Sequence, residues 1–269
     1  MSTIANAVWS PYPATTPGAF LTPSARYISY GVGVLLNGEA QNTNPAAIYD
    51  TCIGAAPGCT PASVATVTSA ANSVPVPSAD GRYLVYENSN SQIVLHDSCL
   101  GAPAGCAVSE TVVSDATMTC GSSSISSDGE YIAWMCSTSQ VYLQATCHNA
   151  SSGCSTTPSL IAHSSQYTQP LWVSTGGRFV TFQQFNAPNG QDEVYLYDSC
   201  NGGPTGCTPQ SIPISANASG ALANNETFLV GMSSDGKYVL FSSQATNFTT
   251  IPAGAYGITI SYIALNPLF

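Results

Sequence analysis

The chain has 269 residues and a net charge of −10, and charged residues make up 7% of it, against roughly 25% in ordinary soluble proteins. Only four residues are Lys or Arg, whereas nucleic acids and anionic membranes attract clustered basic side chains. The composition therefore argues against nucleic acid as a partner. No stretch is long enough to insert into a membrane as a spanning helix. A surface so poor in charge is usual for secreted proteins, and it permits close packing between subunits.

The first segment, residues 1–17, contains a strand candidate at Thr3–Val8 followed by a Pro-rich connector. It has neither a basic cluster nor an apolar run, so a secretory signal is missing. We therefore expect the chain to be a mature form or a piece of a longer precursor.

The remainder, residues 18–269, repeats one phrase five times, and Ser78–Tyr86 shows it best. A turn at Asp80-Gly81 comes first, because Gly accepts a positive φ and Asp caps its own backbone turn. The residues after the turn alternate with the period of two that is expected of a strand. The aromatic residue that opens this strand recurs at intervals of 56, 48, 48 and 59 residues: Tyr27, Tyr83, Tyr131, Phe179 and Tyr238.

Short strands that repeat about every 50 residues predict an all-β fold, a single five-bladed β-propeller with four-stranded blades. A parallel β-helix would need shorter repeats, and a helical solenoid would need a 3.6-residue period that is absent. In chain order the blades are expected at approximately 18–70, 71–116, 117–165, 166–220 and 221–269.

The fifth blade has too little sequence for a fourth strand, since only Leu265–Phe269 follow its third. Propellers commonly close by letting one terminus complete the last blade, which removes an exposed edge. We favour closure by Thr3–Val8 within the same molecule. The alternative is that this strand completes blade five of a neighbour, which would give a homopolymeric filament. The candidate assembly contacts are Thr3, Ile4, Ala5, Val8 and Trp9.

All four basic residues occupy the same position of the repeat, just before the strand aromatic, and the third copy has Glu130 there. An Asp also recurs before each of three cysteine motifs. We interpret the two sets as structural ion pairs, with ligand binding as the alternative. The basic residues are Arg26, Arg82, Arg178 and Lys237, and the acids are Asp50, Asp97 and Asp198.

The phrase Ser-x-Asp-Gly-Arg/Lys-aromatic-aliphatic-x-aromatic resembles the repeats of TolB-like and related WD-type β-propellers. The resemblance runs from about Gly18 to the end of the chain. It implies the fold and leaves the function open, because such propellers serve as binding platforms, enzyme domains and scaffolds. Two features depart from the family: TolB-like propellers commonly have six blades, and paired cysteines are not part of the usual motif.

Eight of the ten cysteines form four Cys-x6-Cys pairs, each after the third strand of a blade. We predict that each pair is a local disulfide, worth about 2.5 kcal/mol in the chain-entropy model. Zinc would need Cys-x2-Cys spacing and His partners, so we expect no metal and no other cofactor. The predicted pairs are Cys52–Cys59, Cys99–Cys106, Cys147–Cys154 and Cys200–Cys207.

The other two cysteines, Cys120 and Cys136, flank the turn at Ser126–Gly129. Folding a hairpin about that turn places residues opposite each other when their numbers sum to 255 or 256, and this pair gives 256. A fifth disulfide is therefore predicted. Five bonds with no leftover thiol indicate an oxidising compartment, extracellular or at the cell surface.

Four Asn-x-Ser/Thr sequons agree with export, although a chain rich in Ser, Thr and Asn also produces them by chance. Whether any of them carries a glycan depends on the organism. The candidate glycosylation sites are Asn149, Asn217, Asn225 and Asn247.

The candidate catalytic residues are the three histidines and the carboxylates that the repeat does not explain. Nucleophilic hydrolysis needs a base beside the nucleophile, and we expect none among His96, His148 and His163. A glycosidase would need paired acids at inner-strand ends facing the axis, and we assign no catalytic residue. The unexplained acids are Glu39, Glu87, Glu110, Asp115, Asp192, Glu193 and Glu226.

The sequence thus predicts a non-catalytic extracellular propeller that acts as a structural or adhesive surface module, with self-assembly through the N-terminal strand as an option. The first alternative is carbohydrate recognition, for which Trp9 and Tyr12 are the best exposed aromatic candidates, because Trp134 and most Tyr occupy core positions of the repeat. A glycosidase is the second alternative.

Overall fold

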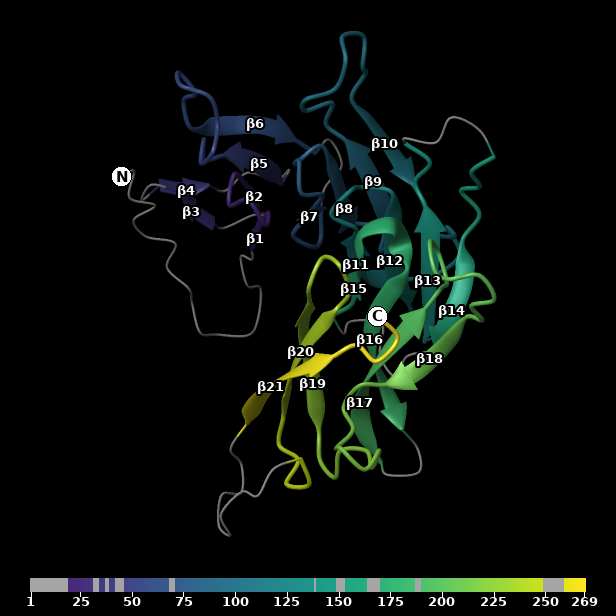
Figure 1. Ribbon diagram of the computed structural model, residues 1–269. Coiled ribbons are helices and arrows are strands. Elements are labelled where there is room, and N and C mark those ends of the chain that lie inside the picture. Colours follow the sequence, from purple (N-terminus) through teal and green to yellow (C-terminus); the bar gives the residue numbers. More distant parts are fainter. Residues whose placement is uncertain are drawn as a thin grey trace. The chain divides into compact units, whose positions relative to one another are not determined.

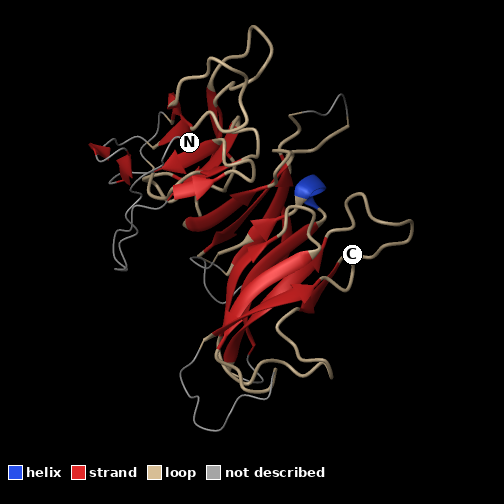
Figure 2. Cartoon of the chain, turned by 60° about the vertical axis from the view of Figure 1, so that its left-hand side comes forward, coloured by secondary structure: helices blue, strands red, loops and turns tan. Residues whose placement is uncertain are grey.

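The computed structural model describes residues 19–30, 34–36, 39–41, 46–67, 71–137, 139–148, 153–163, 170–186, 190–248 and 259–269. The chain divides into two compact units, Met1–Thr117 and Met118–Phe269. Within the described ranges the regular structure is almost entirely strand, with one 3₁₀ turn, η1 (Thr175–Gly177) (Figure 2). The predicted all-β class is confirmed.

The first unit contains two four-stranded antiparallel sheets, blades 1 and 2 (Figure 1). Blade 1 has the order β1-β2-β5-β6, and blade 2 has its strands in sequence order. The strands of blade 1 are β1 (Ala19–Leu21), β2 (Tyr27–Tyr30), β5 (Ala47–Asp50) and β6 (Ala62–Thr66). Those of blade 2 are β7 (Val76–Pro77), β8 (Tyr83–Glu87), β9 (Ile93–Asp97) and β10 (Ser109–Val112).

Blade 1 also carries an insertion that the sequence did not predict. Between β2 and β5 the chain forms a two-stranded hairpin of β3 (Val34–Leu36) and β4 (Glu39–Gln41). This hairpin is why the first interval of the repeat is longer than the next two.

The second unit contains blades 3, 4 and 5, again antiparallel and in sequence order. Blade 3 consists of β11 (Cys120–Ile125), β12 (Tyr131–Cys136), β13 (Gln140–Ala145) and β14 (Ser159–His163). Blade 4 consists of β15 (Trp172–Val173), β16 (Phe179–Asn186), β17 (Gln191–Asp198) and β18 (Gln210–Pro213). Blade 5 has three strands in the described chain: β19 (Thr227–Met232), β20 (Tyr238–Ser243) and β21 (Ile260–Leu265).

Burial within a blade follows the position of the strand. The second strands β8 and β12 are buried along almost their whole length, whereas the fourth strands β10 and β18 are mostly exposed. A strand that is covered on both faces favours continuous apolar sequence rather than alternation. The sequence of β12, Tyr-Ile-Ala-Trp-Met-Cys, is such a run.

The described residues form three hydrophobic cores between neighbouring blades of the same unit. One joins blades 1 and 2 through residues such as Ile48 and Leu84. In the second unit, one core joins blades 3 and 4, and another joins blades 4 and 5 around Phe179 and Phe241. Each large apolar side chain that is fully buried stabilises the fold by about 1.5–3 kcal/mol, so contacts between blades hold each unit together.

A glycine of one blade's turn packs against the aromatic ring of the preceding blade. A Cβ at Gly81 would lie 2.7 Å from Cγ of Tyr27, and one at Gly177 would lie 2.2 Å from Cγ of Tyr131. The two glycines also have φ values of 75° and 67°, a region that L side chains rarely adopt. Backbone conformation and close packing therefore both require glycine in this turn. The same contact joins Gly236 to Phe179.

Candidate functional site

The repeated turn is a small hydrogen-bond network, seen most clearly in blade 2. The Ser78 hydroxyl donates to Asp80 Oδ1 at 2.6 Å and accepts from the Tyr83 amide at 3.0 Å. Asp80 Oδ1 also accepts from the Arg82 amide at 3.0 Å. Ser126 with Asp128 and Ser233 with Asp235 repeat these bonds. The Ser-x-Asp-Gly phrase is thus explained by turn structure.

The basic residue of the repeat is held from two sides. In blade 2 the Arg82 guanidinium donates Nε–H to Asp97 Oδ1 at 2.9 Å and Nη2–H to Oδ2 at 2.8 Å. Its Cζ also lies 4.7 Å from the centroid of the Tyr83 ring. The hydrogen bonds to Asp97 raise the pKa of Arg82. A planar guanidinium suits a bidentate carboxylate and a ring face at the same time.

Blades 1 and 4 repeat the arrangement, and blades 3 and 5 depart from it. In blades 1 and 4, Nε–H of the Arg donates to Oδ1 of the Asp and Nη2–H donates to Oδ2. The two distances are 3.4 and 3.3 Å for Arg26 with Asp50, and 3.1 and 3.0 Å for Arg178 with Asp198. The predicted structural pairs are therefore present in three blades. In blade 5 the position of the Asp carries Leu265, which pairs with Tyr238 across the sheet, and Lys237 Nζ lies 5.6 Å from the ring centroid of Tyr238.

In blade 3 both partners of the pair are replaced, by Glu130 before the aromatic and by Ala145 at the position of the Asp. All four basic residues of the chain lie over rings of other blades. The ring of Tyr131 therefore has no Lys or Arg of this chain over it. Tyr131 is half-buried, whereas Tyr27, Tyr83 and Phe179 are 7%, 2% and 2% exposed.

Each Cys-x6-Cys pair is a disulfide that closes the loop between the third and fourth strands, as predicted. In blade 2 the Asp97 carboxylate accepts from the Cys99 amide at 2.8 Å, and Cys99 has a φ of +59°. The ion pair thus also fixes the turn that begins the loop. We call these four bonds the staples: Cys52–Cys59, Cys99–Cys106, Cys147–Cys154 and Cys200–Cys207.

Three staples place an Asp oxygen and two Cys sulfurs within 4.8 Å of one another. A cysteine ligates a metal ion as its thiolate. These sulfurs are instead bonded in disulfides, and there is no free cysteine among the described residues. Each carboxylate in turn holds an Arg. The proximity is therefore explained by the staple and its ion pair.

The fifth disulfide joins Cys120 of β11 to Cys136 of β12, which lie directly opposite each other. Next to the turn the residue numbers of paired positions sum to 257, as in Ile125 with Ile132. The register shifts between Cys120 and Ser123, and this bulge brings the two cysteines into register. The predicted pairing is correct, although the predicted sum of 255 or 256 does not hold near the turn.

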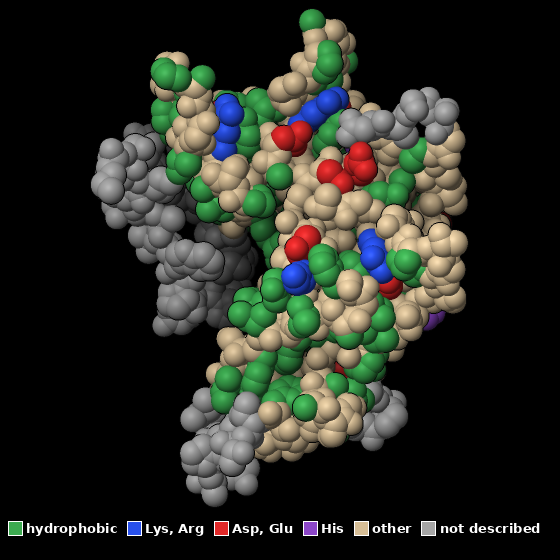
Figure 3. Space-filling model, in the orientation of Figure 1, with side chains coloured by type: hydrophobic (Ala, Val, Ile, Leu, Met, Phe, Trp, Pro, Cys, Tyr) green, Lys and Arg blue, Asp and Glu red, His purple; other side chains and the backbone are tan. Residues whose placement is uncertain are grey.

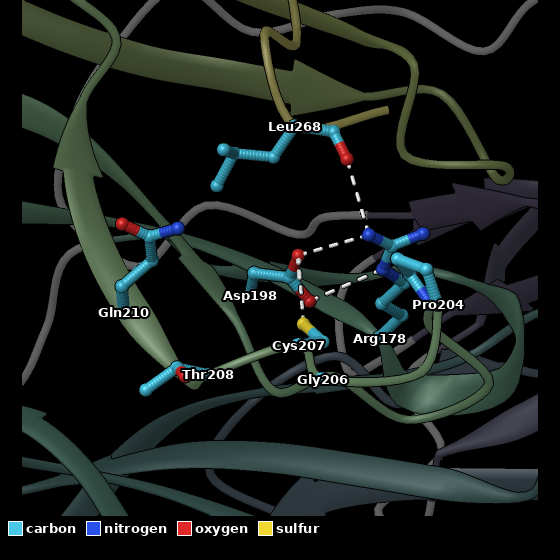
Figure 4. Close-up of a pocket in the computed structure, with 8 residues that line it drawn as sticks. All are labelled: Arg178, Asp198, Pro204, Gly206, Cys207, Thr208, Gln210 and Leu268. Carbon is cyan, nitrogen blue, oxygen red and sulfur yellow. Dashed lines mark hydrogen bonds and ion pairs between the residues drawn. The ribbon is translucent and has the colours of Figure 1, made fainter.

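Pockets recur at the staple ends of neighbouring blades within a unit. One of about 490 Å³ in the first unit includes Arg26 and Arg82 in its lining. One of about 430 Å³, shown in Figure 4, contains the Arg178–Asp198 pair, with Arg178 Nη2 also donating to the Leu268 carbonyl at 3.1 Å. A third, of about 590 Å³, lies between blades 3 and 4. Within each unit the basic side chains form separate small areas rather than a patch (Figure 3).

The histidines are not arranged together in the described chain. His96 is fully buried, and its Nδ1 lies 3.1 Å from Glu110 Oε1. His148 and His163 are exposed. Among the unexplained acids, Glu226 Oε2 accepts from the backbone amide of Asp192 at 3.4 Å. Glu193 is fully buried and accepts a hydrogen bond from the Ser215 hydroxyl.

The three sequon asparagines that the structure describes all make side-chain hydrogen bonds. Asn217 Nδ2 donates to the Asn247 carbonyl at 3.2 Å, and Asn247 Nδ2 donates to the Leu222 carbonyl at 2.6 Å. Asn225 is half-buried and accepts from the Glu226 amide. Asn149 lies outside the described residues, as do the N-terminal candidates Thr3, Ile4, Ala5, Val8, Trp9 and Tyr12. No helix in the described ranges has the length and hydropathy of a membrane span.

Comparison with known proteins gives a fold and no family. No family model matches the chain, and no curated protein sequence matches it. Among solved structures, the tricorn protease aligns over 83% of this chain and 18% of its own, with 10% identity and a TM-score of 0.50. The Swd1 β-propeller domain of Myceliophteria thermophila aligns over 84% of this chain, with 10% identity and a TM-score of 0.49. A putative TolB from Agrobacterium tumefaciens aligns over 86%, with 15% identity and a TM-score of 0.47.

The blade topology together with the alignment to the tricorn protease identifies the fold as that of a β-propeller. The chain spans 65% of the Swd1 domain and 70% of the putative TolB. At these identities the similarity concerns the fold alone.

Proposed function

We propose that the chain is an extracellular, non-catalytic propeller that serves as a structural or adhesive surface module, and that it can polymerise by strand addition as an option beside closure within one molecule. In this proposal Thr3–Val8 of one molecule pairs with β21 of the next. The observation that carries the proposal is the edge of blade 5, where β21 is the outermost of three strands in the described chain.

The sequence of β21, Ile-Ser-Tyr-Ile-Ala-Leu, lacks the usual protections of an edge strand. It contains no charged residue and no proline, which are the devices that keep natural edges from pairing with other chains. Ile263 and Leu265 are 73% and 62% exposed. An added strand would satisfy the free backbone groups of this edge and cover part of its apolar surface.

The rest of the molecule agrees with exposure outside the cell. Five disulfides, with no free cysteine in the described chain, are typical of proteins that fold in an oxidising compartment. Closure by Thr3–Val8 within one molecule is the alternative use of the same edge.

Deletion of residues 1–9 tests the assembly. The full chain should form particles larger than a monomer in light scattering and fibres in electron microscopy, and the deleted chain should stay monomeric. The substitution Ala5→Pro should act in the same direction because it removes a backbone donor from the added strand. Thr15→Pro, in the connector that is already rich in proline, is the matched control and should leave assembly intact.

A synthetic peptide of residues 1–9 should raise the Tm of the deleted chain, since it supplies the missing strand in trans. Assembly that survives the deletion would refute strand addition. A full chain that remains monomeric at all concentrations would favour intramolecular closure instead.

The glycosidase alternative can be tested at Asp192 and Glu226, two unexplained acids that are linked by a hydrogen bond from the Asp192 backbone amide to the Glu226 carboxylate. Hydrolysis of a polysaccharide that is abolished by Asp192→Asn or Glu226→Gln would replace the non-catalytic proposal with this one.

A further inference from the structure

The cleft of about 590 Å³ between blades 3 and 4 differs in chemistry from the other two staple-end pockets. Those pockets contain Arg and Asp side chains, whereas none of the residues that line this one is charged. Its lining combines aromatic rings with hydroxyl and amide groups, among them Tyr131, Tyr197, Ser159 and Asn201. Its volume falls in the range of about 300–1,000 Å³ that is usual for small-molecule sites.

The absence of charge follows from the double replacement in blade 3. An Asp at the position of Ala145 and an Arg at the position of Glu130 would place an ion pair in this cleft, as the Arg178–Asp198 pair lies in the pocket next to blade 5. Ala145 itself lines the cleft. Both members of the pair have changed together in one blade, and the result is an uncharged cleft.

The same replacement leaves the Tyr131 ring without a cation stacked on it. In the other four blades a cation of the chain lies 4.6–5.6 Å from the centroid of the corresponding ring. Tyr131 has the contact with Gly177 and no such cation. Its ring is fixed by Gly177 and is half-exposed at the cleft, which makes it a rigid aromatic surface against which a ligand can stack.

Polar groups surround the ring from both blades. Tyr197 and Asn201 come from blade 4, and Ser155, Thr157 and Ser159 come from the staple loop and fourth strand of blade 3. Hydroxyls both donate and accept hydrogen bonds, and an amide offers both kinds of group. The Asn201 side chain is held in place by its bond to the Gly177 carbonyl at 3.3 Å.

We propose that this cleft is a binding site for a neutral carbohydrate, with a sugar ring stacked on Tyr131 and its hydroxyls bonded by Tyr197, Asn201 and the hydroxyls of blade 3. A sugar presents an apolar ring face and a rim of neutral donors and acceptors, which is the pattern that the cleft complements. The site lies wholly in the second unit and does not depend on strand addition, so the chain that lacks residues 1–9 should bind sugar as well as the full chain.

The test introduces into blade 3 the Arg and Asp that blades 1, 2 and 4 have at the corresponding positions of the repeat. The double variant E130R/A145D should rebuild the ion pair and place a guanidinium over Tyr131, as Arg178 lies over Phe179. The probes are maltotriose, cellotriose, chitotriose and mannotriose, measured by calorimetry and saturation-transfer NMR up to 10 mM. At least one should bind the unmodified full chain with a Kd of about 1 mM, and E130R/A145D should weaken that binding by about tenfold or more.

The matched control is K237R/L265D, which makes the same repair in blade 5 and should change sugar affinity by less than about twofold. Both double variants should keep or raise the Tm, which separates lost binding from unfolding. A second variant, Asn201→Ala, removes one hydrogen-bonding group and should weaken the same sugar by several-fold.

Three results would overturn the proposal. The first is that none of the four trisaccharides binds. The second is that E130R/A145D binds the sugar as well as the unmodified chain. The third is that agmatine binds at Tyr131 while the sugars do not. Agmatine is a small guanidinium compound that resembles the Arg side chain stacked on the corresponding ring of other blades.

Discussion

Blades 3 and 4 are built on the same turn and the same strand order, but their turns are reinforced by different interactions. Blade 4 joins its second and third strands with the Arg178–Asp198 ion pair. Blade 3 has Glu130 and Ala145 at those positions and adds the disulfide Cys120–Cys136 between its first and second strands. The ion pair is therefore a replaceable part of the blade, whereas the turn glycine with a positive φ, Gly129 in blade 3 and Gly177 in blade 4, is kept in both.

Removing the extra disulfide is expected to have the largest effect. The double variant C120A/C136A opens a loop of 16 residues and should lower the free energy of unfolding by about 3 kcal/mol. The equivalent change to the staple of blade 4, C200A/C207A, opens a separation of 7 residues and should lower it by about 2.5 kcal/mol. Urea unfolding under non-reducing conditions measures both. A loss of less than about 1 kcal/mol for C120A/C136A would mean that this disulfide does not compensate for the missing ion pair.

Substitutions at the adjacent glycines Gly176 and Gly177 distinguish the stability cost of backbone strain from that of overpacking. Both have a positive φ, of 69° and 67°, but only Gly177 lies against the Tyr131 ring. Gly176→Ala should lower stability by about 1 kcal/mol, from the left-handed conformation alone. Gly177→Ala should lower it by about 3 kcal/mol, because overpacking is added. Equal losses in thermal unfolding would show that the ring contact carries no energy.

The stability contributed by the Arg178–Asp198 ion pair of blade 4 can be compared with that of Glu130, which replaces the basic residue in blade 3. Arg178→Met leaves the Asp198 carboxylate, whose side chain is 3% exposed, without its guanidinium. We expect a loss of about 1.5 kcal/mol, less than for a fully buried pair because the Arg is partly in solvent. Glu130→Gln in blade 3 is the matched control and should change stability by less than about 0.5 kcal/mol. Chemical denaturation of the two variants in parallel gives the difference, and a larger loss from Glu130→Gln would reverse the comparison.

The smallest expected effect concerns alkaline pH. Burial raises the pKa of Tyr197, a residue that lines the cleft from blade 4, above its usual value of about 10. The folded state therefore keeps the phenol proton at a pH where the unfolded chain loses it. The resulting stability is fully present below about pH 10 and is lost as the pH rises further. Tyr197→Phe should flatten the decline of Tm between about pH 9 and 11, and an unchanged slope would contradict this assignment.

Much of the blade architecture could be predicted because turn chemistry and strand period repeat. The second strands beginning at Tyr27 and Tyr131 start where the phrase indicates. The Cys120–Cys136 bond was predicted from simple hairpin geometry, but the bulge beside it was not, because an extra residue in one strand leaves no trace in the residue types. The hairpin β3–β4 was missed because it is an insertion outside the repeated phrase.

The ion pairs were predictable as a correlation between Arg and Asp positions, whereas the stacking of each cation on its neighbouring ring was not. The uncharged cleft could not be predicted from the sequence for the same reason, because it depends on which residues the fold brings together. The sequence shows that Glu130 breaks the pattern, but the second half of the replacement, Ala145, becomes visible only once the register of β12 and β13 pairs it with Tyr131. Residues that are distant in sequence form a site only through the register of the sheet.

Every disulfide of this chain joins cysteines that are 7 or 16 positions apart. Each can therefore form as soon as its own hairpin has been synthesised, without waiting for a distant part of the polypeptide. Oxidative maturation would then proceed from the N-terminus in the order of the repeats, and non-native thiol pairings would have little time to compete. A molecule cut between two repeats would also separate into pieces in denaturant without a reducing agent, since no sulfur bridge ties one repeat to the next.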